Sequence, residues 1–302
     1  MINSIINKYL DRKDTSDLSW RIILNFRSYC YRLITRQPNY IKANLELNNI
    51  YKGKRCFILG NGPSLNQLDF RMLKDEYVFT VNMLMEHEKF SELNSNFHVM
   101  VDDAIFRSND NSGLEKDYYL NKIKKLYQYR DLILFVPYRN ANEIKKKGID
   151  KNINVRYLHG YNHYKSIGRI QIDKIMPAFN KVIQYAIAIA IYMGFDEINL
   201  LGCEETGILP FINLIMTGET NDDHCYKDTD DEKKSWGKWI LAEGISHLFE
   251  DQAMVFRRYE LISDYCNKNK IILQNLTPNT LIDSVNKMQL EKVLRGNINE
   301  NK

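Results

Sequence analysis

The stretch FILGNGPSL, residues 57–65, predicts a buried strand that runs into a tight turn and then into a helix. Gly60 and Gly62 allow a close approach of the backbone, and Pro63 suits the first turn of a helix. The N–H groups of such a turn can hold a phosphate, because the start of a helix is electropositive. An ordinary strand-to-helix turn without a ligand is the alternative.

The two standard phosphate-binding loops do not fit this turn. The dinucleotide pattern G-x-G-x-x-G needs a third glycine where the chain has Leu65, and the next predicted strand ends in Asn82 instead of an acidic residue. The pattern G-x-x-x-x-G-K-[ST] needs a lysine that is absent after the turn. The sequence therefore disfavours both an NAD site and a P-loop.

Apolar runs and helical patterns alternate along the rest of the chain. Strands are expected at 55–60, 76–84, 97–106, 132–138, 153–159, 196–205 and 270–278, and helices at 64–75, 178–194 and 252–269. This alternation is typical of an α/β protein with a mostly parallel sheet and helices on both faces. Ligands of such sheets bind beyond the carboxyl ends of the strands, so the polar residues at the strand ends are the candidates for a site.

Three further regions complete the predicted organisation. Residues 1–50 are expected to form an N-terminal helical extension, 51–290 the catalytic domain and 291–302 a polar tail. The strand and helix pattern breaks down at about 206–250, which we interpret as a lid over the site because of its aromatic content. Residues 17–36 mix arginines with apolar side chains, so they can either contact an anionic membrane surface or pack on the main domain.

Composition excludes several classes of function. The 42 basic and 38 acidic residues give a net charge of only +4, which is atypical of nucleic-acid binding. The five cysteines are widely spaced and favour free thiols in a reducing cytoplasm. The N-terminus lacks the pattern of a signal peptide, and no apolar run is long enough for a transmembrane helix.

Several motifs together resemble the bacterial sialyltransferases of glycosyltransferase family 42 and their relatives, the motility-associated and capsule-locus glycosyltransferases and the hydroxymethylpterin diphosphokinase-like proteins. The motifs are GNGPSL after the first strand, AIAIAIYMGFDEINLLGCEE at 186–205, Asn82, and LTPNTLID at 276–283. The resemblance covers roughly residues 54–285. It implies a Rossmann-like sheet of the GT-A-like variant, and inverting transfer of a sialic-acid-like sugar from a CMP-linked donor without a metal or other cofactor.

The resemblance also implies roles for individual residues. A lid histidine would take the proton of the acceptor hydroxyl, which suits the pKa of histidine. His224 is the first candidate, with His247 as the second, and Tyr226 is a donor to the leaving phosphate. The predicted nucleotide-binding residues are Gly60, Asn61, Gly62, Pro63, Ser64, Asn82, Asp102, Asp103, Lys181, Glu204, Pro278, Asn279 and Thr280.

Some residues leave alternatives open. Asp102 and Asp103 can contact ribose hydroxyls, hold Mg²⁺ against a diphosphate, or cap a helix. Asp222 and Asp223 can orient His224, which can also be an ordinary surface histidine. His159 and His163 can be acceptor contacts. Asn180, Lys181 and Val182 replace small hydroxyl residues of the sialyltransferases, and Thr206 replaces a tyrosine, so the donor sugar stays open.

The sequence therefore predicts an inverting glycosyltransferase with a nucleotide-sugar donor and a surface glycan or lipid-linked glycan acceptor, such as capsule or lipopolysaccharide. A cytoplasmic protein is expected, at the inner face of the membrane if residues 17–36 contact lipid, and a homo-oligomer is the expected assembly. The alternatives are an ATP- and Mg²⁺-dependent diphosphokinase-like enzyme and a non-catalytic nucleotide-binding protein.

Overall fold

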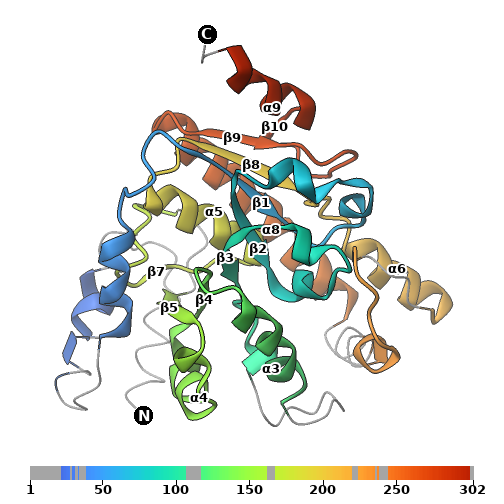
Figure 1. Ribbon diagram of the computed structural model, residues 1–302. Coiled ribbons are helices and arrows are strands. Elements are labelled where there is room, and N and C mark those ends of the chain that lie inside the picture. The colour runs from blue at the N-terminus through green and yellow to red at the C-terminus, as the bar shows by residue number, and fades with distance from the viewer. Residues whose placement is uncertain are drawn as a thin grey trace.

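The computed structural model describes residues 22–27, 29, 30, 33, 39–106, 117–161, 167–219, 224–234, 237 and 244–299. Its centre is a parallel sheet of eight strands in the order β10-β9-β8-β1-β2-β3-β4-β5 (Figure 1). The strands are β1 Arg55–Leu59, β2 Tyr77–Val81, β3 Ser95–Val99, β4 Ile133–Pro137, β5 Asn154–Leu158, β8 Glu197–Leu201, β9 Ile272–Asn275 and β10 Asn286–Lys287. A small parallel pair is formed by β6 Gly160–Tyr161 and β7 Met176–Pro177.

Helices connect the strands. The α-helices are α3 Tyr118–Ile123, α4 Ala141–Lys146, α5 Val182–Met193, α6 Ile208–Thr217, α8 Ile245–Lys268 and α9 Leu290–Asn299. The 3₁₀ helices are η1 Tyr40–Leu47, η2 Pro63–Gln67, η3 Phe70–Leu73, η4 Asn82–Glu86, η5 Phe90–Glu92, η6 Asp103–Phe106, η7 Lys124–Gln128, η8 Tyr138–Asn140 and η9 Ile149–Lys151.

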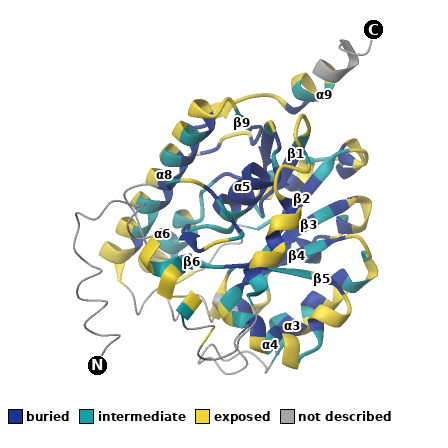
Figure 2. Cartoon of the chain, turned by 90° about the vertical axis from the view of Figure 1, so that its left-hand side faces the viewer, coloured by how far each residue is buried: buried dark blue, intermediate teal, exposed yellow. Residues whose placement is uncertain are grey.

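The sheet separates two hydrophobic cores, because successive side chains of a strand point to opposite faces. On β1, Cys56 and Ile58 pack with α5 and α8, whereas Phe57 and Leu59 pack with the short helices of the other face. Figure 2 shows the strands as the buried centre and exposed residues along α8. The fold is therefore a Rossmann-like α/β fold with helices on both faces, as the sequence predicts.

The order of the strands places a topological switch point between β1 and β8. From β1 the chain adds β2, β3, β4 and β5 in one direction, and it then returns through α5 to add β8 on the other side of β1. Helix α5 is apolar on all sides, because it lies between the sheet and α8. It ends at Gly194 (φ +89°), where a Cβ would lie 2.8 Å from Asn49 Cα.

The lid differs from its prediction as an irregular segment. In its described parts, residues 208–217 form α6, residues 230–234 are helical, and α8 begins at Ile245 instead of at 252. No residue of α6 is buried, and Met216 is 78% exposed. Helix α6 projects at one side of the molecule in Figure 1.

The predicted N-terminal extension is partly described. Residues 22–27 are helical, and η1 packs on β5 through Asn44, whose amide donates to the carbonyl oxygens of Tyr157 (2.8 Å) and Ile172 (2.7 Å). Most of the candidate membrane segment 17–36 lies outside the described residues. In the described part of the chain, no helix combines the length and the apolar character that a membrane span requires.

Candidate active site

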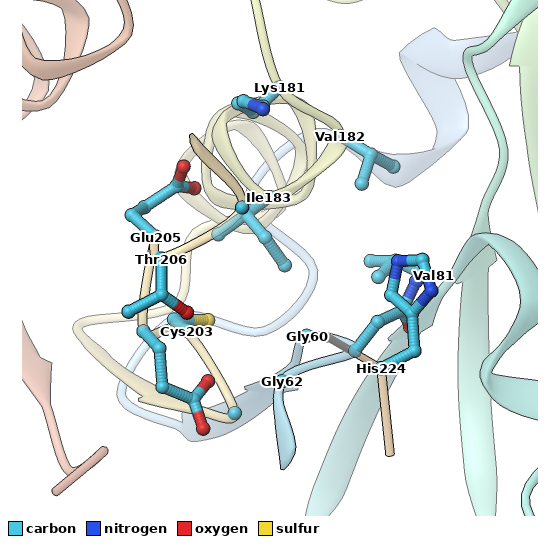
Figure 3. Close-up of a pocket in the computed structure, with 14 residues that line it drawn as sticks. Gly60, Gly62, Val81, Lys181, Val182, Ile183, Cys203, Glu205, Thr206 and His224 are labelled. Carbon is cyan, nitrogen blue, oxygen red and sulfur yellow. The ribbon is translucent and has the colours of Figure 1, made fainter. Parts of the chain in front are cut away.

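A pocket of about 150 Å³ lies at the carboxyl ends of β1 and β8, at the switch point of the sheet. Its wall is formed by the turn at 60–62, by Val81 at the end of β2, by the start of α5 at 181–183, by the loop after β8 at 202–207, and by His224. Figure 3 shows His224 beside Val81 on one side of the pocket, with Cys203, Glu205 and Thr206 on the opposite side. Ligands of open α/β sheets bind at this position.

The turn Gly60–Ser64 is bonded to the loop after β8. The N–H groups of Gly60 and Gly62 donate to the carbonyl oxygens of Leu201 (2.8 Å) and Gly202 (2.9 Å). The N–H group of Ser64, at the start of η2, donates to Glu204 Oε1 (2.8 Å). The anion at this helix start is therefore a carboxylate of the protein itself, and phosphate binding by the turn stays a prediction.

The two glycines of the turn are required by their neighbours. A Cβ on Gly60 would lie 2.2 Å from Gly202 O, and a Cβ on Gly62 would lie 1.5 Å from Glu204 Oε2. Glu204 is 7% exposed, and its Oε2 has no hydrogen-bond partner among the described residues. A buried carboxylate oxygen without a donor costs free energy, and a role for Glu204 in ligand binding stays a prediction.

His224 lines the pocket and is bonded to a carboxylate. Its Nδ1 is 2.7 Å from Asp228 Oδ2, and its ring stacks on Tyr226 with centroids 4.9 Å apart. A carboxylate at Nδ1 favours the tautomer with its proton on that nitrogen, so Nε2 is the basic nitrogen of the neutral imidazole. This arrangement orients the imidazole, and the role of His224 as a general base stays a prediction.

Asp228 was not predicted from the sequence, although its position four residues after His224 was the signal. The predicted partners, Asp222 and Asp223, lie outside the described residues. Burial, and then the charge of Asp228, raise the pKa of the Tyr226 phenol well above its ordinary value, so Tyr226 is a neutral hydrogen-bond donor.

A capping box holds the segment that follows His224. The N–H of Thr229 donates to Glu232 Oε2 (2.9 Å), and the N–H of Glu232 is 3.2 Å from Thr229 Oγ1. Lys122 of α3 donates to Glu232 Oε1 (3.0 Å). The pattern T-x-x-E is the sequence signal for this box, which the sequence analysis missed.

Lys181 lies at the start of α5, where the helix dipole adds to its positive charge. Across the pocket, Glu205 adopts a left-handed backbone (φ +55°) and accepts a hydrogen bond from the buried Tyr259 hydroxyl (2.9 Å). The pocket thus combines one cationic wall with hydrogen-bond acceptors.

Asn82 follows Val81 at the end of β2, at the same edge of the sheet as the pocket. Its backbone is left-handed (φ +44°), and its Oδ1 is buried without a hydrogen-bond partner among the described residues. His98 Nε2 is 2.9 Å from the backbone oxygen of Asn82.

Pro63, Ser64, Asn82, Tyr226 and the remaining predicted residues lie outside the pocket wall. Asp102 is exposed after β3, and the side chain of Asp103 is not described. Within the described ranges, no group of three or more His, Cys, Asp or Glu residues could hold a metal. His247 is exposed near the start of α8.

The segment Pro278–Thr280 supports the loop after β8. Pro278 and Asn279 are exposed, whereas the buried Thr280 hydroxyl donates to the carbonyl oxygen of Cys203 (2.7 Å). Thr277 Oγ1 accepts a hydrogen bond from the Cys203 N–H (2.9 Å). Contact of these residues with a nucleotide stays a prediction. Of the other candidates, the His159 ring stacks on Tyr138 (5.1 Å), and His163 lies outside the described residues.

No protein family and no curated protein matches the chain by sequence. Among solved structures, the chain is similar to the MAf glycosyltransferase from Magnetospirillum magneticum AMB-1, with a TM-score of 0.45 and 13% sequence identity. The similarity covers 83% of this chain and 37% of that one, so the chain spans little more than a third of the length of its neighbour. At this level the similarity is too low to assign an activity.

Proposed function

We propose that the protein is an inverting glycosyltransferase that uses a nucleotide-activated, sialic-acid-like sugar, with CMP as the nucleotide. The observation that carries the proposal is the His224–Asp228 pair at the pocket of the switch point. A sugar acceptor attacks through a hydroxyl group, whose proton a positioned base must take at neutral pH.

Two requirements of the donor, a positive group for its phosphate and acceptors for its hydroxyls, support the same proposal. The leaving nucleotide carries negative charge, which Lys181 and the electropositive start of α5 can stabilise. The sugar and ribose hydroxyls need acceptors, and Glu204 Oε2 is a buried acceptor without a donor among the described residues. A pocket of about 150 Å³ is smaller than typical whole-ligand sites, so it suits the phosphate and the anomeric centre better than the entire donor.

The test is a comparison of two histidine variants. Transfer from CMP-linked, UDP-linked and GDP-linked sugars to glycan acceptors is measured, with and without EDTA, together with CMP binding by calorimetry. In His224→Ala, kcat is expected to fall at least ~100-fold, because a general base contributes about that factor or more, while CMP affinity stays within about threefold. His247→Ala is the matched control and is expected to keep its activity.

Full transfer by His224→Ala would overturn the assignment of the base. Turnover of ATP that EDTA abolishes, without sugar transfer, would instead support the diphosphokinase-like alternative. Failure to bind any of CMP, CDP, UDP, GDP or ATP would support a non-catalytic role.

A further inference from the structure

A series of buried, hydrogen-bonded polar side chains on two strands of the sheet leads to the backbone of Asn82. Thr80 and His98 are 0% exposed and Ser95 is 4% exposed, on the neighbouring strands β2 and β3. Polar groups in an apolar core are costly unless they are hydrogen-bonded. All three side chains are hydrogen-bonded, and the last hydrogen bond of the series is to the backbone oxygen of Asn82.

The direction of each hydrogen bond follows from the last one. A carbonyl oxygen only accepts, so His98 Nε2 carries the proton that it donates to Asn82 O (2.9 Å). In the neutral ring, Nδ1 is then an acceptor, and it accepts a hydrogen bond from Thr80 Oγ1 (2.8 Å). Burial lowers the pKa of His98 to about 4, so the ring is neutral at pH 7 and keeps this single tautomer.

Asn82 is held in a conformation that is unfavourable without compensation. A left-handed backbone is uncommon for a residue with a side chain, although asparagine adopts it more readily than most, and a buried amide oxygen without a donor among the described residues costs further free energy. Such strain persists only where the surrounding structure imposes it, and it concentrates at binding sites. One group that bonds to the backbone of Asn82 from outside its own helix η4 is the His98 imidazole.

We propose that His98 is a positioning residue, which holds Asn82 in the left-handed conformation so that the Asn82 amide can bind the nucleoside part of the donor. The Asn82 Oδ1, which has no hydrogen-bond partner among the described residues, would accept a hydrogen bond from a ribose hydroxyl or an exocyclic amine of the nucleoside. This inference rests on the proposed nucleotide-dependent function. His98 itself is fully buried and acts only through Asn82.

The first experiment measures the Kd of CMP by calorimetry in a double-mutant cycle. Asn82→Gly removes the amide but suits a left-handed backbone, and His98→Leu removes the donor. Each is expected to weaken binding about tenfold, the value of one or two hydrogen bonds. The double variant should bind no more weakly than Asn82→Gly, because His98 acts through the amide. His98→Gln, which can donate from a similar position, should stay within about threefold of the wild type.

The second experiment needs no nucleotide. Selective labelling of asparagine gives the backbone chemical shifts of Asn82, which report its φ angle in the unliganded protein. Left-handed shifts are expected in the wild type and in His98→Gln, and their loss is expected in His98→Leu. His87→Leu is the matched control, because His87 is also buried (5% exposed) but bonds to Asn66 through its Nε2.

The outcomes separate this inference from the proposed function. If Asn82→Gly weakens CMP binding and His98→Leu does not, or if Asn82 stays left-handed in His98→Leu, the positioning role is wrong. If the double variant binds tenfold more weakly than Asn82→Gly, His98 acts by another route and the inference also fails. If the wild type does not bind CMP, the proposed donor is wrong, while the chemical shifts still decide whether His98 holds Asn82.

Discussion

The turn Gly60–Ser64 and the segment 224–234 form two walls of the same pocket region, yet they are held in different ways. The turn is held by its main chain, whose N–H groups bond to the loop after β8. The segment has one main-chain hydrogen bond to the turn, from Cys225 N–H to Asn61 O (2.7 Å), and is otherwise held by the side-chain pairs His224–Asp228, Thr229–Glu232 and Lys122–Glu232. Of the two, only the segment contributes titratable side chains.

This difference predicts that the turn contributes mainly to stability, whereas the segment contributes mainly to the orientation of reactive groups. A main-chain connection fixes the backbone and tolerates no added atom, so damage to the turn should appear as lost stability. Side-chain pairs orient individual groups, so damage to the segment should appear in the reaction or in the pH dependence of stability. Three substitutions test this division; the first two have a control variant, and the third is compared with the wild type at two pH values.

Gly60→Ala is expected to have the largest effect. Its Cβ would lie 2.2 Å from the backbone oxygen of Gly202, so a strand end must move, at a cost of about 3 kcal/mol of unfolding free energy. Gly218→Ala is the control: nothing lies within 4 Å of its Cβ, and only its left-handed φ (+77°) costs about 1 kcal/mol. Urea unfolding measures both variants. A smaller loss for Gly60→Ala than for Gly218→Ala would contradict the scaffold role of the turn.

Asp228→Asn is expected to reduce kcat by roughly 10- to 100-fold, with little change of stability. An asparagine amide can donate to Nδ1 of His224, which moves the ring proton to Nε2 and removes the base. The control is Asp231→Asn, since that carboxylate lies in the same segment with its side chain 74% exposed. Steady-state transfer and a thermal melt measure the two effects. Equal kcat values for the two variants would show that Asp228 does not orient the base.

Glu232→Gln is expected to have the smallest effect, about 1–2 kcal/mol of unfolding free energy at pH 7, because it weakens hydrogen bonds to a buried carboxylate. Burial raises the pKa of Glu232, but the Thr229 N–H and the Lys122 ammonium outweigh burial and lower it below its ordinary 4.5. A lowered folded-state pKa stabilises the protein above pH 4.5, and that contribution is lost as the pH falls through the folded value.

Urea unfolding of the wild type and of Glu232→Gln at pH 7 and at pH 3 tests this sign. The wild type should be the more stable protein at pH 7, and the difference should shrink at pH 3. A difference that grows at low pH would show that Glu232 is protonated, or unpaired, in the folded protein.

The local sequence pattern was enough to predict the strands, but it did not predict the helices of the lid. Every predicted strand overlaps one in the sheet, because a buried parallel strand is a short continuous apolar run. The lid was predicted as irregular because its glycines and acids interrupt the pattern. Its run ILPFINLIMT forms α6 nonetheless, and residues 245–251 extend α8. The run contains Pro210, which the helix tolerates because this proline lies in the first turn of α6.

The candidate site was predicted in part. His224, Lys181 and Glu204 line the pocket together with Gly60, Asn61 and Gly62, because strand ends of a parallel sheet meet at one edge. The sequence did not indicate that Glu204 would occupy the start of η2, or that His98 would contact the backbone of Asn82. Both contacts join residues from different strands, and no local pattern encodes them.

The sequence by itself determined the α/β class, the parallel sheet and the strand that ends in Gly60-Asn61-Gly62-Pro63-Ser64, since these depend on apolar periodicity and turn residues within short windows. Only the tertiary structure decided what this turn holds. Ser64 and Glu204 are 140 residues apart in the chain, and they meet because β8 is added beside β1 after the chain has crossed the sheet. The carboxylate then takes the position at the helix start that an anionic ligand could have taken.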